Sequence, residues 1–199
     1  MALNKQAKTL SSKQCELVLT YLQNTRSPLR NRLIFLLSTK AGLRAKEISS
    51  LRWGMVLDSD GSVSDFINIT NAASKGRNGG RTIPLNKLLK ETLINFLEYQ
   101  KSNRVFDVDG CVISTQRSPS TSAQSIVNMF QGWYRDLNLI GCSSHSGRRT
   151  FITNCSKKIT TVGGSLRDVQ YLAGHSSLQT TQQYIEGDTL SKVKVVNLI

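Results

Sequence analysis

The chain has few acidic residues, and this shortage limits what it can bind. Asp and Glu number 13 in 199 residues, against 26 Lys and Arg, which gives a formal net charge of +13 and an isoelectric point near 9.9. Such an imbalance does not set a fold, but it strongly favours a polyanionic partner, because neutralising a phosphate backbone releases condensed counterions. Nucleic acid is therefore the expected partner, although a basic ribosomal or membrane-surface protein would share the charge.

Long apolar runs and closely paired cysteines are also lacking. No segment approaches the ~20 apolar residues that a membrane span needs. The first residues, Met-Ala-Leu-Asn-Lys-Gln, contain no apolar stretch of signal-peptide length. We therefore expect a cytoplasmic protein that does not bind membranes. The cysteines are widely spaced without a C-x-x-C motif, so reduced thiols are expected rather than a disulfide framework.

Two signals for metal binding are incomplete. Cys142 and His145 form a C-x-x-H pair, and Cys155 and His175 follow, but a zinc site usually shows two tight ligand pairs. The segment 58–61, Asp-Ser-Asp-Gly, resembles the start of a calcium loop without its third ligand pair and closing Glu, so a plain turn is expected there. The sequence therefore predicts no metal and no cofactor.

Hydrophobic periodicity predicts one mainly α-helical domain of the α+β class with a small antiparallel sheet. Helical spacing and caps place helix starts near Ser12, Pro28, Ala45, Asn86, Thr121, Ser144, Leu166 and Ser176. Strands are expected at 53–57, 66–70 and 81–85, with a basic hairpin loop over 71–80. The helix after Pro28 is apolar nearly all round at 33–37, so it is expected to be central to the core.

His145 and Arg148 are the first candidate phosphate ligands. Residues three apart lie on one face of a helix, so both side chains can point at the same phosphate, near a helix end where backbone N–H groups also favour an anion. Alone, H-x-x-R is a weak signal that also fits a solvated helix face. Arg149 competes with Arg148, but Arg148 has the better spacing to His145, and Arg149 is assigned to DNA binding.

Arg44 and Glu47 form a second candidate pair, three residues apart. A surface ion pair of little energetic value is one interpretation. The other is that Glu47 orients the guanidinium of Arg44 so that it binds phosphate oxygens bidentately. The residues alone do not decide between the two.

Lys75 lies in the Gly-rich loop together with Arg77 and Arg81, and no acid occurs between Phe66 and Lys90. A flexible basic loop that touches DNA non-specifically explains these residues as well as a chemical role does. In the chemical role, Lys75 is a general acid for a departing 5′-oxygen, and surrounding positive charge lowers its pKa toward that task.

His175 and Tyr184 are a stronger signal for a functional site together than either residue is alone. Taken singly, a histidine at a helix boundary is usually a cap or a partly buried donor, and a tyrosine is usually a packing residue. Here they bound the segment Leu-Ala-Gly-His-Ser-Ser-Leu-Gln-Thr-Thr-Gln-Gln-Tyr.

Four segments in this order and spacing resemble the catalytic domain of the tyrosine recombinases, also called the phage integrase family. They are Ala41-Gly-Leu-Arg-Ala-Lys-Glu-Ile48, Ser74-Lys-Gly-Arg to Arg81-Thr-Ile-Pro84, His145-Ser-Gly-Arg148, and Leu172-Ala-Gly-His175 to Tyr184. The resemblance covers the chain from about residue 10 to 186. It implies that the catalytic positions are Arg44, Lys75, His145, Arg148, His175 and Tyr184, with Glu47 as supporting acid.

The resemblance implies a metal-free and ATP-free transesterification. Tyr184 attacks a scissile phosphate, forms a 3′-phosphotyrosine and releases a 5′-hydroxyl, so that the bond energy is conserved. Arg44 and Arg148 stabilise the five-coordinate phosphorus, and His175 adds a donor. His145 exchanges a proton with the tyrosine, and Lys75 protonates the leaving oxygen.

The expected function is therefore site-specific DNA recombination, with double-stranded DNA, a homotetramer on paired sites and accessory DNA-bending proteins as partners. A type IB topoisomerase, a non-catalytic DNA-binding regulator on the same fold, and a basic RNA-binding protein are the alternatives. The expected organisation is an extension over 1–10, the catalytic domain over 11–186 and a tail over 187–199. The apolar tail either packs on its own domain or docks on a neighbouring subunit. The short extension suits a minimal recombinase or an excised fragment.

Overall fold

A computed structural model of the protein describes residues 6–74, 80–103, 105–115, 118–184 and 196–197. Its helices are α1 (Ser12–Gln23), α2 (Pro28–Lys40), α3 (Ala45–Ser49), α4 (Lys87–Asn103), α5 (Ala123–Asp136), α6 (Ser146–Lys158), α7 (Leu166–Ala173) and α8 (Leu178–Gln182). Two 3₁₀ turns, η1 (Trp53–Met55) and η2 (Ile159–Val162), and the strands β1 (Phe66–Ile69) and β2 (Arg81–Pro84) complete the described elements. The predicted class, mainly α with a small antiparallel sheet, is confirmed.

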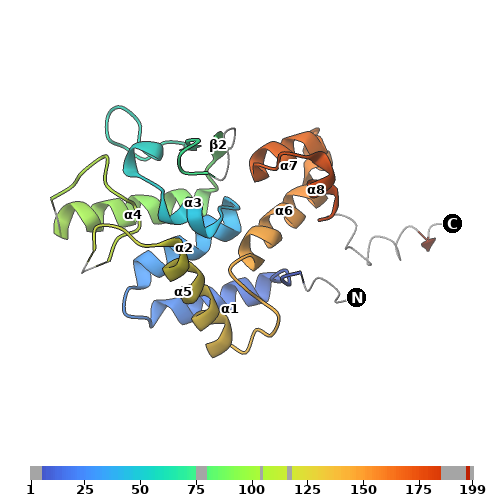
Figure 1. The fold of residues 1–199 in the computed structure, drawn as a ribbon, viewed down its shortest axis with the longest axis horizontal. Helices are drawn as coiled ribbons and strands as arrows, with labels where there is room; N and C mark the ends of the chain where they lie inside the picture. Colours follow the sequence, from blue (N-terminus) through green and yellow to red (C-terminus); the bar gives the residue numbers. More distant parts are fainter. Residues whose placement is uncertain (1–5, 75–79, 104, 116–117, 185–195, 198–199) are drawn as a thin grey trace.

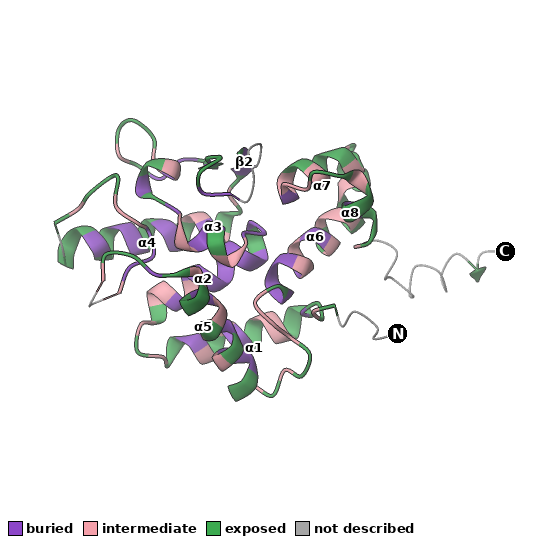
Figure 2. Cartoon of the chain, in the orientation of Figure 1, coloured by how far each residue is buried: buried purple, intermediate pink, exposed green. Residues whose placement is uncertain are grey.

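Helix α2 is the central element of the main core. Pro28 occupies its first turn, where the missing N–H costs nothing. The run 33–37 is fully buried, as predicted, and α2 packs against α1, α4 and α6. Figure 2 shows the buried residues gathered along α2 and on one side of α4. Burial of each such large side chain contributes about 1.5–3 kcal/mol.

Local capping signals set several helix starts. Ser11 and Gln14 form the capping box of α1, since each side chain accepts a hydrogen bond from the backbone N–H of the other. The caps of α5 and α8 are Ser122 and Ser177, each one residue later than the predicted caps Thr121 and Ser176. Helix α6 begins after His145, which occupies the cap position without a side-chain cap bond.

The predicted strand at 53–57 is wrong, because this segment forms the 3₁₀ turn η1. Its N–H groups bond to loop carbonyls instead of a strand: that of Trp53 donates to Gly110 and that of Gly54 to Val108. Trp53 and Val56, three residues apart, are both buried, and the Trp53 ring packs on Phe96 at a centroid distance of 6.2 Å. Spacing of three fits a helical turn better than an alternating strand.

The sheet consists of β1 and β2 paired antiparallel, with Ile67 opposite Ile83. Alternate residues face the core, so Arg81 shares the inward face with Ile83. The segment 58–61 is a turn, as predicted, closed by a hydrogen bond from the Gly61 N–H to the Asp58 carbonyl.

A second, smaller core lies beside the main one. Ile152 of α6 and Val169 and Ala173 of α7 form it. Figure 1 shows α7 and α8 packed together at the end of α6 that lies away from α4. None of the helices in the described part of the chain has the length and apolarity needed to cross a membrane. The polar groups described next lie where the two cores meet.

Candidate active site

The C-terminal end of α7 is held by three arginines from three other elements. The last carbonyls of a helix have no partner within it and carry partial negative charge, so guanidinium donors stabilise them. Arg81 Nε donates to the Leu172 carbonyl at 2.9 Å, Arg148 Nη2 to that of Ala173 at 2.5 Å, and Arg44 Nη2 to that of Gly174 at 3.2 Å. These bonds link the main core to the α7–α8 lobe and gather three cationic groups in one place.

Glu47 is the acid that joins two of these arginines. Its Oε1 lies 2.9 Å from Arg44 Nη1 and 2.8 Å from Arg81 Nη1, and its Oε2 accepts from Arg81 Nη2 at 3.2 Å and from the Arg44 backbone N–H at 2.8 Å. The Glu47 side chain is fully buried, whereas that of Arg44 is 27% exposed. Burial alone would raise the pKa of the Glu47 carboxyl, but the bonds and charge of Arg81, with Arg44, lower it below its ordinary value.

Arg148 is the third cation, and a close helix contact positions it. A Cβ on Gly147 would lie 2.5 Å from Ser38 Oγ, so only glycine allows α6 to approach α2 this closely. Arg148 is 4% exposed, and its guanidinium donates from Nη1 to the Gly42 carbonyl at 2.6 Å. Burial, and then the charge of Arg44, lower the pKa of Arg148. Its bonds to Gly42 and Ala173 use two of the five guanidinium donors and leave others for a ligand.

His175 follows α7 directly. Gly174 ends that helix with φ of +59°, a left-handed conformation that glycine adopts without strain. The imidazole Nδ1 lies 2.9 Å from Oγ1 of Thr181, which is fully buried. Burial, with the charges of Arg148 and the other arginines, lowers the pKa of His175 to about 4. The ring is therefore neutral at pH 7 and can donate one hydrogen bond.

Tyr184 lies against these groups. Its ring stacks on His175 with a centroid distance of 5.4 Å and an interplanar angle of 26°, and the guanidinium carbon of Arg149 lies 5.7 Å from its centroid. Tyr184, His145, Arg148 and Arg149 line one pocket of about 290 Å³. The site therefore places a phenol beside a buried arginine cluster in a cavity that solvent can enter.

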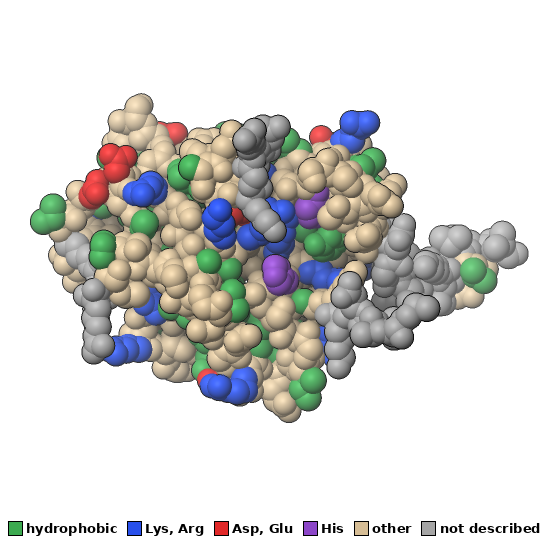
Figure 3. Space-filling model, in the orientation of Figure 1, with side chains coloured by type: hydrophobic (Ala, Val, Ile, Leu, Met, Phe, Trp, Pro, Cys, Tyr) green, Lys and Arg blue, Asp and Glu red, His purple; other side chains and the backbone are tan. Residues whose placement is uncertain are grey.

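The structure brings together most of the residues predicted from the sequence. Figure 3 shows both histidines on one face of the molecule, with Lys and Arg side chains between and around them. His145 is exposed at the pocket, and the predicted pairing of Arg44 with Glu47 is present. Lys75 and Arg77 lie outside the described residues.

Arg81 lies in a different environment from the one expected of a DNA-binding residue. Its side chain is 2% exposed and bonded to Glu47 and the Leu172 carbonyl, which suits a positioning role rather than a contact to DNA. The sequence analysis did not identify Thr181, six residues after His175, as the hydrogen-bond partner of that histidine. The burial of Arg81 could have been predicted from the alternation of β2, which places Arg81 on the same inward face as Ile83.

Within the described ranges, no group of three or more His, Cys, Asp or Glu residues is placed to hold a metal ion. The four cysteines, Cys15, Cys111, Cys142 and Cys155, are free thiols. The described side chains at this site present guanidinium, imidazole and phenol groups. Such a set suits a phosphodiester, whose oxygens accept hydrogen bonds and whose phosphorus accepts a nucleophile.

Comparison with known proteins identifies the family. The family model described as the phage integrase family matches residues 8–190, and the chain belongs to this family. It is 27% identical over 179 residues to tyrosine recombinase XerA of Thermococcus onnurineus, a match that covers 89% of this chain and 57% of the relative. It is 29% identical over 189 residues to tyrosine recombinase XerC of Actinobacillus pleuropneumoniae serotype 7, covering 94% and 57%. The chain thus matches little more than half the length of these relatives.

Solved structures share the fold. A crystal structure of XerA recombinase has a TM-score of 0.74 at 19% identity, covering 96% of this chain and 64% of that one. The Tn1549 transposon integrase in complex with transposon right end DNA has a TM-score of 0.73 at 19% identity, covering 98% and 65%.

Proposed function

We propose that the chain cuts and rejoins DNA strands as a tyrosine-type site-specific recombinase. The observation that carries the proposal is the convergence of three arginines at the end of α7, two of them bonded to the carboxylate of Glu47, with Tyr184 beside them. Three cations against one anion leave a net positive charge in a partly desolvated place, and a phosphate would neutralise it. The curated relatives are named tyrosine recombinases rather than topoisomerases, which supports recombination over strand relaxation alone.

In the proposed reaction the Tyr184 phenol oxygen bonds to phosphorus while the bond from phosphorus to the 5′-oxygen breaks. His145 takes the phenol proton, and Lys75 gives a proton to the leaving 5′-oxygen, so charge and atoms balance. A 5′-hydroxyl of another strand then attacks the phosphotyrosine, and the same steps run in reverse. Because each phosphodiester is replaced by an ester of similar energy, the exchange needs no ATP.

The proposal gives each buried residue a task. Arg44 and Arg148 stabilise the extra charge of the five-coordinate phosphorus, and neutral His175 adds a donor that Thr181 orients. Glu47 and Arg81 act as positioning residues, because they hold Arg44 and the end of α7 in place. Loss of one donor to the developing charge typically lowers the rate by ~10²–10³.

The proposed partners follow from the same chemistry. Double-stranded DNA is the substrate, and the similar Tn1549 transposon integrase is described in complex with transposon right end DNA. Strand exchange between two sites needs four cuts, so we propose a homotetramer on paired sites, aided by accessory DNA-bending proteins in the cytoplasm. Docking of the tail on a neighbouring subunit belongs to this proposal, although nearly all of residues 187–199 lies outside the described residues.

The chemistry can be tested with nicked suicide duplexes, from which the short strand is lost after cleavage so that religation fails. Since the target site is not known, the probe is a labelled pool with a randomised core, incubated with the 199-residue chain in EDTA. We expect an adduct that resists denaturant and that Tyr184→Phe abolishes. Tyr171→Phe is the matched control, because Tyr171 is an exposed tyrosine of the same lobe.

An adduct that persists in Tyr184→Phe would refute the assignment of the nucleophile. A wild-type chain that binds the pool but forms no adduct would refute cleavage itself. Sequencing of the trapped duplexes identifies the preferred site, which then serves as the substrate for exchange between two labelled duplexes. Cleavage without exchange would favour the topoisomerase alternative.

A further inference from the structure

Another pocket, with a mixed apolar and cationic lining, lies at the opposite end of α2 from the candidate active site. It opens between the first turn of α2, the C-terminal half of α4 and residues 114–115, and its volume is about 170 Å³. Because α2 has 13 residues, its two ends are about 20 Å apart. A molecule bound here would therefore not occupy the site of Tyr184.

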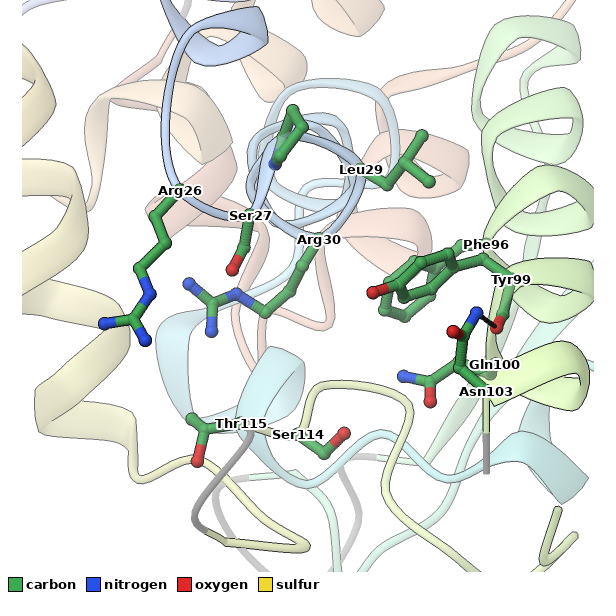
Figure 4. Close-up of a pocket in the computed structure, with 11 residues that line it drawn as sticks. Arg26, Ser27, Leu29, Arg30, Phe96, Tyr99, Gln100, Asn103, Ser114 and Thr115 are labelled. Carbon is green, nitrogen blue, oxygen red and sulfur yellow. Dashed lines mark hydrogen bonds between the residues drawn. The ribbon is translucent and has the colours of Figure 1, made fainter. Parts of the chain in front are cut away.

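The pocket is cationic. Arg26 and Arg30 both line it, and none of the lining residues is acidic. Figure 4 shows the two arginines on one side and Tyr99 and Gln100 on the other. Burial, and then the charge of Arg26, lower the pKa of Arg30, which shows that the two cations repel each other in a partly desolvated place.

Arg30 has a neutral partner. Its Nε and Nη2 donate to Oδ1 of Asn31 at 3.1 and 2.9 Å, and the Asn31 amide donates to Thr25 Oγ1 at 3.0 Å. A carboxamide satisfies hydrogen bonds of the guanidinium but leaves its charge uncompensated. An anion entering the pocket would supply that compensation.

Two further groups point to an anion. Ser27 makes no side-chain cap bond, and the first N–H that bonds within α2 is that of Asn31, so the preceding N–H groups at Leu29 and Arg30 have no helical partner. Gln100 is 9% exposed, lines the pocket, and its side chain makes no hydrogen bond to any described residue. A ligand oxygen in the pocket can accept a hydrogen bond from this amide.

We propose that this pocket binds a phosphate ester. The phosphate lies between the Arg30 guanidinium, the first turn of α2 and the Gln100 amide. The Tyr99 ring, stacked on Phe96 at a centroid distance of 6.2 Å, offers a flat apolar wall for a planar group attached to the phosphate. The phosphate ester is either a free mononucleotide or a segment of DNA backbone, and both present the same group to Arg30 and Gln100.

The test follows the Gln100 side-chain amide by NMR in the ¹⁵N-labelled 199-residue chain. AMP, inorganic phosphate and a 16-base-pair duplex are titrated separately, with resonances of His175 and Arg149 reporting the candidate active site. We expect AMP to shift the Gln100 amide saturably. Asn31→Asp keeps the acceptor that Arg30 uses but adds a compensating charge, so it should weaken AMP binding at Gln100 at least tenfold.

Two variants complete the design. Gln100→Leu removes the amide without removing volume, and AMP binding, followed at the Arg30 Nε–H, should weaken several-fold. This variant tests the proposal if Asn31→Asp does not fold. Arg135→Gln is the matched control, because Arg135 is 80% exposed and lies on α5, outside the pocket. It should leave the affinity unchanged.

The source of the phosphate is read from the titrations. A Gln100 shift with AMP but not with the duplex identifies a free nucleotide, and a shift with the duplex identifies DNA backbone. AMP and duplex shifts that are confined to His175 and Arg149 would overturn the proposal, as would an affinity at Gln100 that Asn31→Asp leaves intact. None of these outcomes depends on DNA cleavage. The phosphate-ester proposal can therefore fail while the recombinase function stands, and the recombinase function can fail while the phosphate-ester proposal stands.

Discussion

Replacement of Arg81 by Met separates a positioning arginine from a DNA-binding one. The Arg81 side chain is 2% exposed, makes two bonds to Glu47 and one to the Leu172 carbonyl, and so ties β2 to both α3 and α7. Methionine fills similar space but supplies neither charge nor donors. Glu47, fully buried, then keeps only Arg44, whose side chain is 27% exposed.

The expected cost follows from this geometry. Removal of one partner of a buried ion pair costs about 3–5 kcal/mol, because the other charge stays buried. Since Arg44 still compensates Glu47 in part, we expect the low end, about 3 kcal/mol, which an ordinary domain stability of about 5–15 kcal/mol tolerates. With a urea m-value of about 2 kcal/mol/M, the unfolding midpoint falls by about 1.5 M.

The assay is urea unfolding followed by circular dichroism, with the suicide-duplex cleavage rate measured on the same samples in the absence of urea. Cleavage should fall at least tenfold, because Arg44 and the end of α7 lose their common anchor. Arg135→Gln, in an exposed pair on α5, should change neither quantity. A stability loss below about 1 kcal/mol with weakened DNA binding would instead identify Arg81 as a DNA contact and refute the positioning role.

Two further predictions concern the end of α7. Gly174→Ala should destabilise the protein more than Gly163→Ala. Both positions have a left-handed φ (+59° and +79°), which costs alanine about 1–2 kcal/mol, but the new Cβ at 174 would also lie 2.8 Å from Arg81 Nη1, whereas the space at 163 is open. Equal losses of stability in urea unfolding would contradict the contact with Arg81. The His175 imidazole should titrate near pH 4 by NMR. Because its pKa is lower in the folded than in the unfolded chain, its contribution to stability should be constant above about pH 6.5 and should fall as the pH drops toward 4, and His175→Gln should remove this decline. A pKa of His175 at or above 6.5 would contradict its burial among the arginines.

Local signals in the sequence predicted the elements well where a few neighbouring residues decide the structure. Ser11 as a cap, and Pro28 in a first turn, act within one turn of the helix that each begins, so these helix starts could be predicted from the sequence. The strand predicted at 53–57 was wrong because Trp53–Met55 form a 3₁₀ turn. Its backbone bonds to residues 108–110, more than fifty positions away, which no local pattern reveals.

In the candidate site, too, contacts between near neighbours in the sequence could be predicted and contacts between distant residues could not. Arg44 and Glu47 are three residues apart, so their pairing was predictable, and it is present. Arg81 is 34 positions from Glu47 and 91 from Leu172, and a basic loop beside it suggested DNA contact instead. Its burial depends on the packing of β2 against α7, which only the folded chain shows.

The covalent intermediate gives the most direct measurement. The trapped adduct is digested with nuclease and protease, and mass spectrometry locates the modified residue. A phosphodiester-linked nucleotide on Tyr184, joined through the 3′ end of the cleaved strand, is the result that the proposed reaction predicts. The nucleotide attached to any other residue, or through a 5′ end, would contradict the proposed mechanism.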